Sequence, residues 1–244
     1  MSLAQVYSKP AVIEACNADF SGRLGLADAF AIFMNLAGEH AEKLGVGIEK
    51  MISRDMFWLT VRTRVRFHRR PRLLEPVTLT TWPEKPGHAR CNRDYLITAG
   101  EELLVEGKTE WSVLRPSDKS IVMANTVFPP ELSFDRPPIL PEPFMRLDRD
   151  FSGAAPFGTY TVKSTDIDVG GHMNNTRYAY MVVSAFSTGE LGAMEVREME
   201  ISFRHPAYEG QTLTLRRRDR QGAIELEAAD SEGTVVMYAR LLLN

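Results

Sequence analysis

Cysteine is scarce in this sequence, since only Cys16 and Cys91 occur among 244 residues. They lie far apart at no metal or redox spacing, which argues against a disulfide scaffold and favours a reducing, cytoplasmic setting. No stretch approaches the roughly 18 apolar residues of a membrane span, and no apolar core near the start predicts a signal peptide. The net charge of −3 gives no positive field, so we expect no nucleic-acid partner.

Two segments show the apolar periodicity of amphipathic helices. The spacing predicts one helix over residues 26–45 and another over residues 174–191. The first apolar stripe is Phe30, Phe33, Met34, Ala37, Ala41 and Leu44, and the second is Tyr178, Met181, Val182, Ala185 and Phe186. Gly45 is a natural stop for the first helix, and Asn174 or Asn175 can cap the start of the second.

Alternating apolar and polar residues follow each predicted helix. In residues 58–67 the alternation predicts a strand whose buried face is formed by Leu59, Val61, Thr63, Val65 and Phe67. Similar segments continue after both helices, so each half reads as a strand, a long helix and several antiparallel strands. A helix with one apolar stripe needs a sheet to pack on. One long helix wrapped by a curved antiparallel sheet is the hotdog architecture.

The chain carries this pattern twice. Asp19 and Gly22 precede the first helix as Asp168 and Gly171 precede the second, 149 residues later. An apolar residue and then a helix follow in both copies. Such an internal period indicates a duplicated fold.

Proline marks the boundary between the two copies. Seven of the fourteen prolines fall in residues 129–157, which predicts an extended connector because proline removes backbone donors and breaks helices. We therefore expect an N-terminal hotdog over residues 1–128, this connector, and a C-terminal hotdog over residues 158–244. The predicted fold class is α+β, a tandem (double) hotdog with two long helices, each wrapped by a curved antiparallel sheet.

The junction before the second helix, DIDVGGHMNN, carries the chemistry. A helix N-terminus offers free N–H groups and partial positive charge, which can hold a carbonyl oxygen as it becomes an oxyanion. His172 suits general acid or base work near neutral pH, and Asp168 can orient it or a water. Asn174 can donate to a carbonyl or accept from the imidazole. We predict these three as catalytic residues and Gly171 and Asn175 as substrate-binding residues, with no metal.

The same residues also have ordinary structural interpretations. Asp168 could cap a turn, and His172 could be a hydrogen-bonded structural side chain. The contrast between the two copies favours chemistry in the second. The first copy has Arg23, Gly25 and Leu26 where the second has the histidine and the two asparagines.

The motif DIDVGGHMNNTRYAYMV resembles the signature of the bacterial acyl-acyl carrier protein thioesterases. The likeness extends along nearly the whole chain, through GRLGLADAFAIFMNLAGEHAEKLG, EWSVLRPSDKSIV and MEISFRHPAYEGQTLTL. It implies a double hotdog that hydrolyses the thioester between a fatty acyl chain and the phosphopantetheine arm of acyl carrier protein. It implies no metal or organic cofactor. Asp168, His172 and Asn174 match the family's motif.

Two positions depart from that family pattern. Gly170 stands where the family has an asparagine, and Pro206 stands where it has a glutamate. Ala207 follows, at a position that is sometimes cysteine in plant members. Glu200 or Glu209 could replace the glutamate only if the fold brings one of them to the site.

Three functions remain open from the sequence. The favoured one is a cytoplasmic thioesterase for fatty acyl-acyl carrier protein, involved in fatty acid biosynthesis. A thioesterase for coenzyme A esters, or a hydratase, on the same fold is the first alternative. A catalytically impaired module that binds acyl carriers is the second. A monomer, which is a pseudo-dimer of hotdogs, and a homodimer are equally compatible with the duplication.

Two further features have a functional and a structural interpretation. The basic segment 62–72 holds six arginines that could dock an acidic carrier protein, although a solvated sheet face is the favoured interpretation here and at residues 216–220. The family resemblance suggests that Phe30, Phe33 and Met34 surround the acyl tail. Packing in the core is the favoured interpretation of that stripe.

Overall fold

A computed structural model describes residues 3–146 and 148–244. The first half contains β1 (Tyr7–Val12), α1 (Leu26–Lys43), α2 (Ile48–Ser53), β2 (Phe57–Phe67), β3 (Pro76–Pro83), β4 (Cys91–Ala99), β5 (Glu102–Arg115) and β6 (Ser120–Val122). The second contains β7 (Ala155–Thr161), α3 (Asn175–Ser184), α4 (Thr188–Ala193), β8 (Val196–Phe203), β9 (Thr212–Arg220), β10 (Ala223–Ala229) and β11 (Val235–Leu243). Short 3-10 turns lie at Ala15–Asn17, Ala124–Thr126 and Ser164–Asp166.

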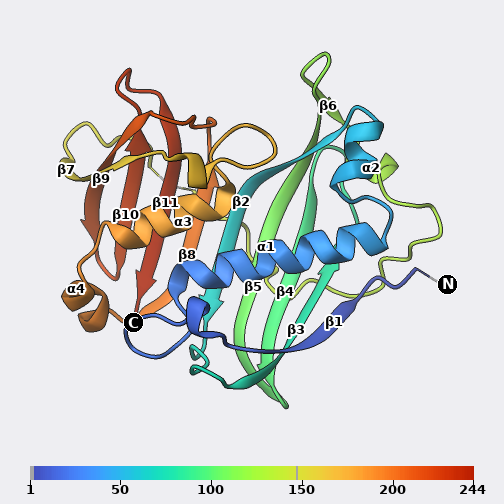
Figure 1. The fold of residues 1–244 in the computed structure, drawn as a ribbon, viewed down its shortest axis with the longest axis horizontal. Coiled ribbons are helices and arrows are strands. Elements are labelled where there is room, and N and C mark those ends of the chain that lie inside the picture. Colours follow the sequence, from blue (N-terminus) through green and yellow to red (C-terminus); the bar gives the residue numbers. More distant parts are fainter. Residues whose placement is uncertain (1–2, 147) are drawn as a thin grey trace.

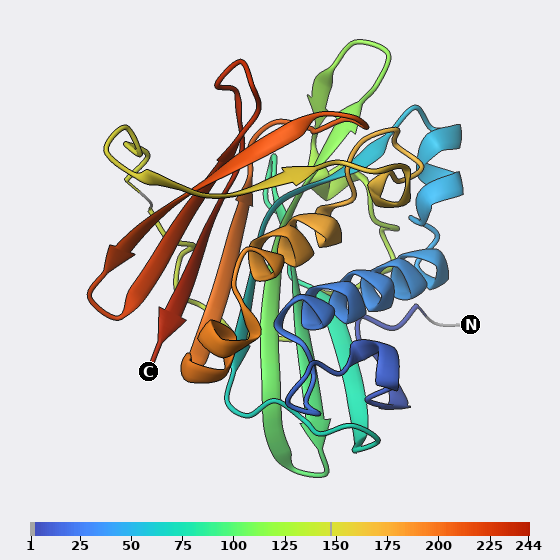
Figure 2. The same cartoon turned by 60° about the vertical axis from the view of Figure 1, so that its left-hand side comes forward.

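One antiparallel sheet runs through both halves. Its order is β1-β3-β4-β5-β2-β8-β11-β10-β9-β7, with β6 paired to β5. The halves join where β2 pairs with β8, with Arg64 opposite Glu200. Figures 1 and 2 show α1 and α3 side by side on one face of this sheet, and the Tyr180 hydroxyl of α3 donates to Asp28 Oδ1 of α1 at 2.6 Å. The predicted α+β double hotdog is therefore confirmed.

Helix α1 forms as its apolar stripe predicts. Phe33 stacks on Tyr95 of β4 with ring centroids 4.7 Å apart, and Phe30 is also fully buried. Glycine at position 107 makes this packing possible, because a Cβ there would lie 2.4 Å from the Phe33 ring. The helix ends at Lys43, and Gly45 beyond its C-cap has φ +69° and donates its N–H to the Glu42 carbonyl at 3.0 Å.

The second predicted helix is interrupted. Residues 174–191 form α3 and the short α4, separated by Ala185–Ser187. Ser187 explains the break, because its hydroxyl accepts from Glu190 N–H at 3.2 Å while the Glu190 carboxylate accepts from Ser187 N–H at 2.9 Å. This reciprocal capping box begins a new helix inside the apolar repeat.

The prediction of which β2 side chains face the helices is wrong for the first residues of the strand. The register with β5 shifts between Thr60 and Arg62, which places one extra residue in β2. Thr60 lies opposite Trp111 and Thr63 opposite Thr109, so both threonines share the face that packs on α1. Leu59, predicted on that face, lies opposite Ser112 and points to the other one.

The connector crosses the outer face of the sheet. Residues 129–154 contain no helix or strand within the described part, and β7 begins at Ala155, three residues before the predicted second hotdog. The Arg64 guanidinium donates to the Pro143 carbonyl at 2.7 Å, and Met145 N–H donates to Glu200 Oε1 at 3.0 Å. Glu200 therefore binds the connector on the face of the sheet opposite the helices.

Arginines of the segment 62–72 are engaged in ion pairs. The pairs include Arg62 with Glu110, Arg64 with Glu200, Arg66 with Glu198, Arg69 with Glu75 and Glu102, and Arg70 with Asp19. Arg64 is 3% exposed, so the solvated face predicted from the charge pattern is wrong there because the connector covers it. Across residues 3–146 and 148–244, no helix is both long enough and apolar enough to cross a membrane.

Candidate active site

A tight loop at the start of α3 holds the predicted motif. Asp168 N–H donates to the His172 carbonyl at 3.0 Å, and Gly171 N–H donates back to the Asp168 carbonyl at 2.9 Å. Gly171 has φ +76°, a left-handed conformation that glycine adopts without steric cost. The first copy has the same device in Gly22, with φ +67°. The loop folds locally in both copies for the same backbone reason.

This loop brings Asp168 and His172 together. The Asp168 Oδ1 and His172 Nδ1 atoms are 3.6 Å apart, and the side chains are 18% and 25% exposed. The same Oδ1 accepts from Gly170 N–H at 2.8 Å, which holds the carboxylate beside the imidazole. This separation lies within ion-pair range and is longer than a direct hydrogen bond.

Asn174 is the N-cap of α3. Its Oδ1 accepts from Thr176 N–H at 2.9 Å and from the Thr176 hydroxyl at 2.8 Å. This oxygen is thus used to start the helix, which leaves the amide Nδ2 as the group able to donate to a ligand. Asn175 is the first helical residue and lines the adjacent cavity, whereas Gly171 does not line it.

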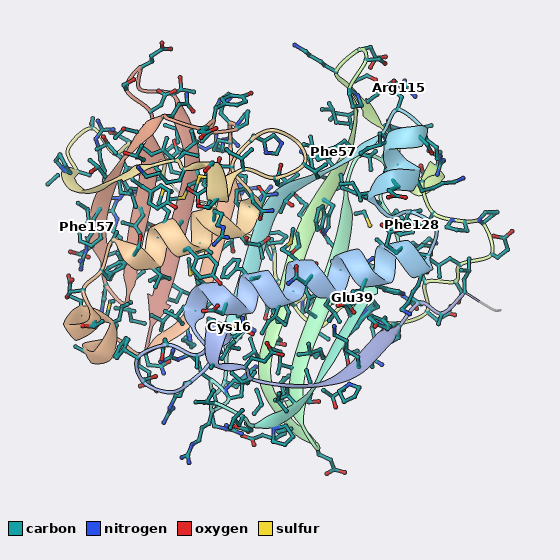
Figure 3. The ribbon with its side chains drawn as sticks, in the orientation of Figure 1. Cys16, Glu39, Phe57, Arg115, Phe128 and Phe157 are labelled. Atoms are coloured by element: carbon teal, nitrogen blue, oxygen red, sulfur yellow. The ribbon has the colours of Figure 1, made fainter. Side chains whose placement is uncertain are left out.

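Phe57 of the first half contacts the imidazole. The Phe57 and His172 rings meet edge to face, with centroids 6.4 Å apart at 90°. Figure 3 shows Phe57 where β2 begins, between the two halves. A Cβ on Gly170 would lie 3.2 Å from Phe57 Cζ and 3.0 Å from both His172 Nε2 and Asp168 Oδ1. The phenyl ring thus occupies room beside the position where the family pattern has asparagine.

The segment after β8 closes the other side of the loop. Met173 N–H donates to the Ala207 carbonyl at 2.8 Å, and Ala207 N–H donates to the Tyr178 hydroxyl at 3.0 Å. Burial raises the pKa of Tyr178 to about 12, so the phenol stays neutral. Pro206 lines the cavity without a side-chain donor or acceptor, and His205 beside it also lines the cavity.

Neither glutamate considered as a replacement reaches this site. Glu200 is buried against Arg64 and the connector, on the opposite face of the sheet. Glu209 is exposed and does not line the cavity. Sequence reasoning missed Phe57, because its proximity depends on strand pairing between the halves. It also missed His205, which the segment after β8 brings to the cavity.

One cavity of about 980 Å³ joins the loop to the first half. Its walls include Met34, Ala37, Gly38 and Ala41 of α1, Trp58 of β2, Cys91 and Arg93 of β4, Trp111 of β5, and Asp168, His172, Asn174 and Asn175. Met34 lines this space as the family resemblance suggested. Phe30 and Phe33 do not line it and pack in the core instead. The cavity is mainly apolar, and the polar loop lies at one part of its wall.

Family comparison matches both halves. Residues 4–123 match the acyl-ACP thioesterase N-terminal domain, and residues 153–240 match the acyl-ACP thioesterase C-terminal domain. The chain belongs to the acyl-ACP thioesterase family. The family predicted from the sequence is therefore confirmed.

Individual relatives of this thioesterase family member are distant in sequence. The chain is 21% identical over 189 residues to an acyl-[acyl-carrier-protein] hydrolase, FATB3, chloroplastic, of Cuphea viscosissima, covering 71% of this chain and 45% of that protein. It is 23% identical over 163 residues to a palmitoyl-acyl carrier protein thioesterase, chloroplastic, of Cuphea hookeriana, covering 64% and 39%. The chain thus spans less than half the length of these curated relatives.

Two solved structures share the fold over nearly the whole length. An acyl-ACP thioesterase from Bacteroides thetaiotaomicron superposes with a TM-score of 0.87 at 20% identity, covering 98% of each chain. A 12:0-ACP thioesterase from Umbellularia californica gives a TM-score of 0.83 at 17% identity, covering 99% of this chain and 98% of that one. Both likenesses concern the fold.

Proposed function

We propose that this chain hydrolyses the thioester between a fatty acyl group and acyl carrier protein, releasing a free fatty acid and the carrier thiol. The observation that carries the proposal is a cavity of about 980 Å³, which joins the Asp168–His172 pair to apolar walls from the first half. An acyl chain fits such walls because burying its methylene groups removes apolar surface from water. The family membership supports the same reaction class.

The proposed chemistry uses His172 as general base. The imidazole takes a proton from water, whose oxygen bonds to the thioester carbonyl carbon, while Asp168 stabilises the imidazolium. The tetrahedral oxyanion then collapses, the carbon–sulfur bond breaks, and the imidazolium returns the proton to the thiolate sulfur. No metal or organic cofactor is needed for these steps.

The N-terminus of α3 is proposed to hold the carbonyl oxygen. Asn175 is the first helical residue, and its N–H lies at the positive end of the helix. Asn174 acts as a positioning residue through its cap and offers its Nδ2 to the substrate. Gly171 contributes the turn that places these groups beside His172.

Acyl carrier protein is the proposed carrier partner. Arg177 and Arg204 line the cavity on the side of the polar loop, where their charges suit the phosphate of a phosphopantetheine arm. The cytoplasm is the proposed compartment, because Cys16 and Cys91 are both free thiols. The strand edge that one hotdog would offer to a second copy is already paired within this chain, because β2 pairs with β8. We therefore propose a monomer over a homodimer, which sedimentation can test.

One substrate panel separates the competing functions. Wild type and His172→Ala are assayed on acyl carrier protein and coenzyme A thioesters of equal chain length, with His68→Ala as a control because His68 does not line the cavity. We expect higher kcat/KM on carrier protein substrates and a loss of about 10²- to 10⁴-fold in His172→Ala only. Preference for coenzyme A would overturn the carrier assignment. Tight binding without turnover would identify a binding module instead.

A further inference from the structure

Arg93 places a buried positive charge on the wall of the acyl cavity. The residue is on β4, is 6% exposed and lines the cavity. Among residues 3–146 and 148–244, no carboxylate forms an ion pair with its guanidinium. Burying a charge without a partner is strongly destabilising, and arginine does not escape the cost by losing its proton.

Neutral groups hold the guanidinium in place. Arg93 Nη1 donates to His40 Nδ1 at 2.9 Å and to the Thr81 hydroxyl at 3.3 Å. His40 Nε2 lies 3.0 Å from the Ala4 carbonyl, which can only accept, so Nε2 carries the proton and Nδ1 is the acceptor. Burial and the Arg93 charge lower the pKa of His40 to about 4, so the imidazole is neutral at physiological pH. These contacts orient the charge and do not neutralise it.

Arg93 lines the cavity and keeps donors that no described residue engages. Among the described residues, both hydrogen bonds of its guanidinium start from Nη1, which leaves Nη2 and Nε for another partner. Together these two nitrogens present the planar fork that suits a carboxylate. A plain hydrocarbon tail would leave this charge unsatisfied.

Strand register places Arg93 far from the reacting carbonyl. Arg93 lies opposite Thr109 of β5, whereas Phe57, the neighbour of His172, lies opposite Leu114 of the same strand. Five residues of β5 separate the two levels, which is about 17 Å along the strand. A group that reaches Arg93 therefore sits toward the distal end of the acyl chain.

We propose that Arg93 is a subsite for a carboxylate at the distal end of the acyl chain, so that the substrate class includes thioesters of dicarboxylic acids. This inference rests on the proposed thioesterase function for its turnover readout. Arg93 would be a specificity-determining residue that binds the far carboxylate while the thioester lies at His172.

Matched substrates test the subsite. Acyl carrier protein is loaded with chains of equal length that end in a methyl group or a carboxylate, and kcat/KM is measured for wild type and Arg93→Met. Arg90→Met is the control, because Arg90 also lines the cavity but is half exposed and pairs with Glu110. We expect Arg93→Met to lower the carboxylate-to-methyl ratio of kcat/KM by about 10- to 100-fold and Arg90→Met to leave it unchanged. An unchanged ratio in Arg93→Met overturns the inference.

A binding measurement separates this inference from the proposed function. Calorimetric titration of wild type, His172→Ala and Arg93→Met with a free dicarboxylic acid and a monocarboxylic acid of equal length needs no turnover. We expect wild type and His172→Ala to prefer the dicarboxylic acid and Arg93→Met to lose that preference. If wild type hydrolyses none of the thioesters but still prefers the dicarboxylic acid, only the proposed function is overturned. Equal binding of both acids by wild type overturns the subsite. Arg93→Lys is the second variant, which keeps the charge if Arg93→Met does not fold.

Discussion

Gly170→Asn introduces the residue that the family pattern has beside the proposed catalytic pair, Asp168 and His172. A Cβ at this position lies 3.0 Å from both His172 Nε2 and Asp168 Oδ1, and 3.2 Å from Phe57 Cζ. Ordinary contacts begin near 3.4 Å, so these neighbours must move by a few tenths of an ångström. Overpacking of this kind costs about 1–3 kcal/mol, and a shift of about 1 Å in catalytic geometry can cost about 10²-fold in rate.

We therefore expect Gly170→Asn to lower kcat by about 5- to 30-fold, because the shift is smaller than 1 Å. Phe57→Leu removes the ring atom nearest to position 170 and should restore most of that loss in the double variant. The assay is steady-state hydrolysis of acyl carrier protein thioesters, arranged as a double-mutant cycle with thermal unfolding as the control for folding. Two results refute the reasoning. One is a higher kcat in Gly170→Asn with Phe57 present, and the other is a cycle in which the two changes simply add.

Three further predictions concern the loop and the stability of the fold. Gly171→Ala and its counterpart Gly22→Ala should each lower the free energy of unfolding by about 1–2 kcal/mol in urea titrations, because both positions are left-handed, but only Gly171→Ala should reduce hydrolysis. Asn174→Ala should cost about 0.5–2 kcal/mol of stability through the lost cap. Asn174→Ser should restore stability, and it restores kcat only if capping is the whole role of the residue. The hydrogen bond from Arg69 lowers the pKa of Glu75 to about 2. The Glu75 carboxylate therefore contributes its full stabilisation of the fold above pH 4.5, and this stabilisation is lost as pH falls toward 2. Acid unfolding of Glu75→Gln should therefore show a smaller fall in stability over that range than wild type.

The local parts of the fold were predictable because they depend on neighbours in sequence. The apolar stripe predicted α1 at residues 26–45, and the structure has it at Leu26–Lys43 with the expected stop at Gly45. The duplicated Asp–Gly turn could also be predicted from the repeated residues, and in the structure both glycines adopt the same left-handed conformation. The break before α4 depends on the Ser187 capping box, which the apolar repeat masks.

The rest depends on contacts between distant segments. The extra residue near Thr60 reverses the faces of β2, and alternation alone cannot reveal a bulge. Phe57 reaches His172 only because the two halves are joined through β2 and β8. Arg93 is not distinguished by the sequence, because its contact with His40 depends on how β4 packs against α1. In the motif, Asp168 and His172 were predicted as a pair and Asn174 or Asn175 as the cap of the second helix, and the hydrogen bonds identify Asn174 as that cap.

Single-turnover hydrolysis tests the central claim most directly. Wild type or His172→Ala, each in excess over substrate, is mixed with a fatty acyl-acyl carrier protein, and the release of free fatty acid is followed over time. We predict complete release by wild type and a rate lower by about 10²- to 10⁴-fold in a folded His172→Ala protein. Release by folded His172→Ala at the wild-type rate would contradict the assignment of the Asp168–His172 pair as the catalytic centre.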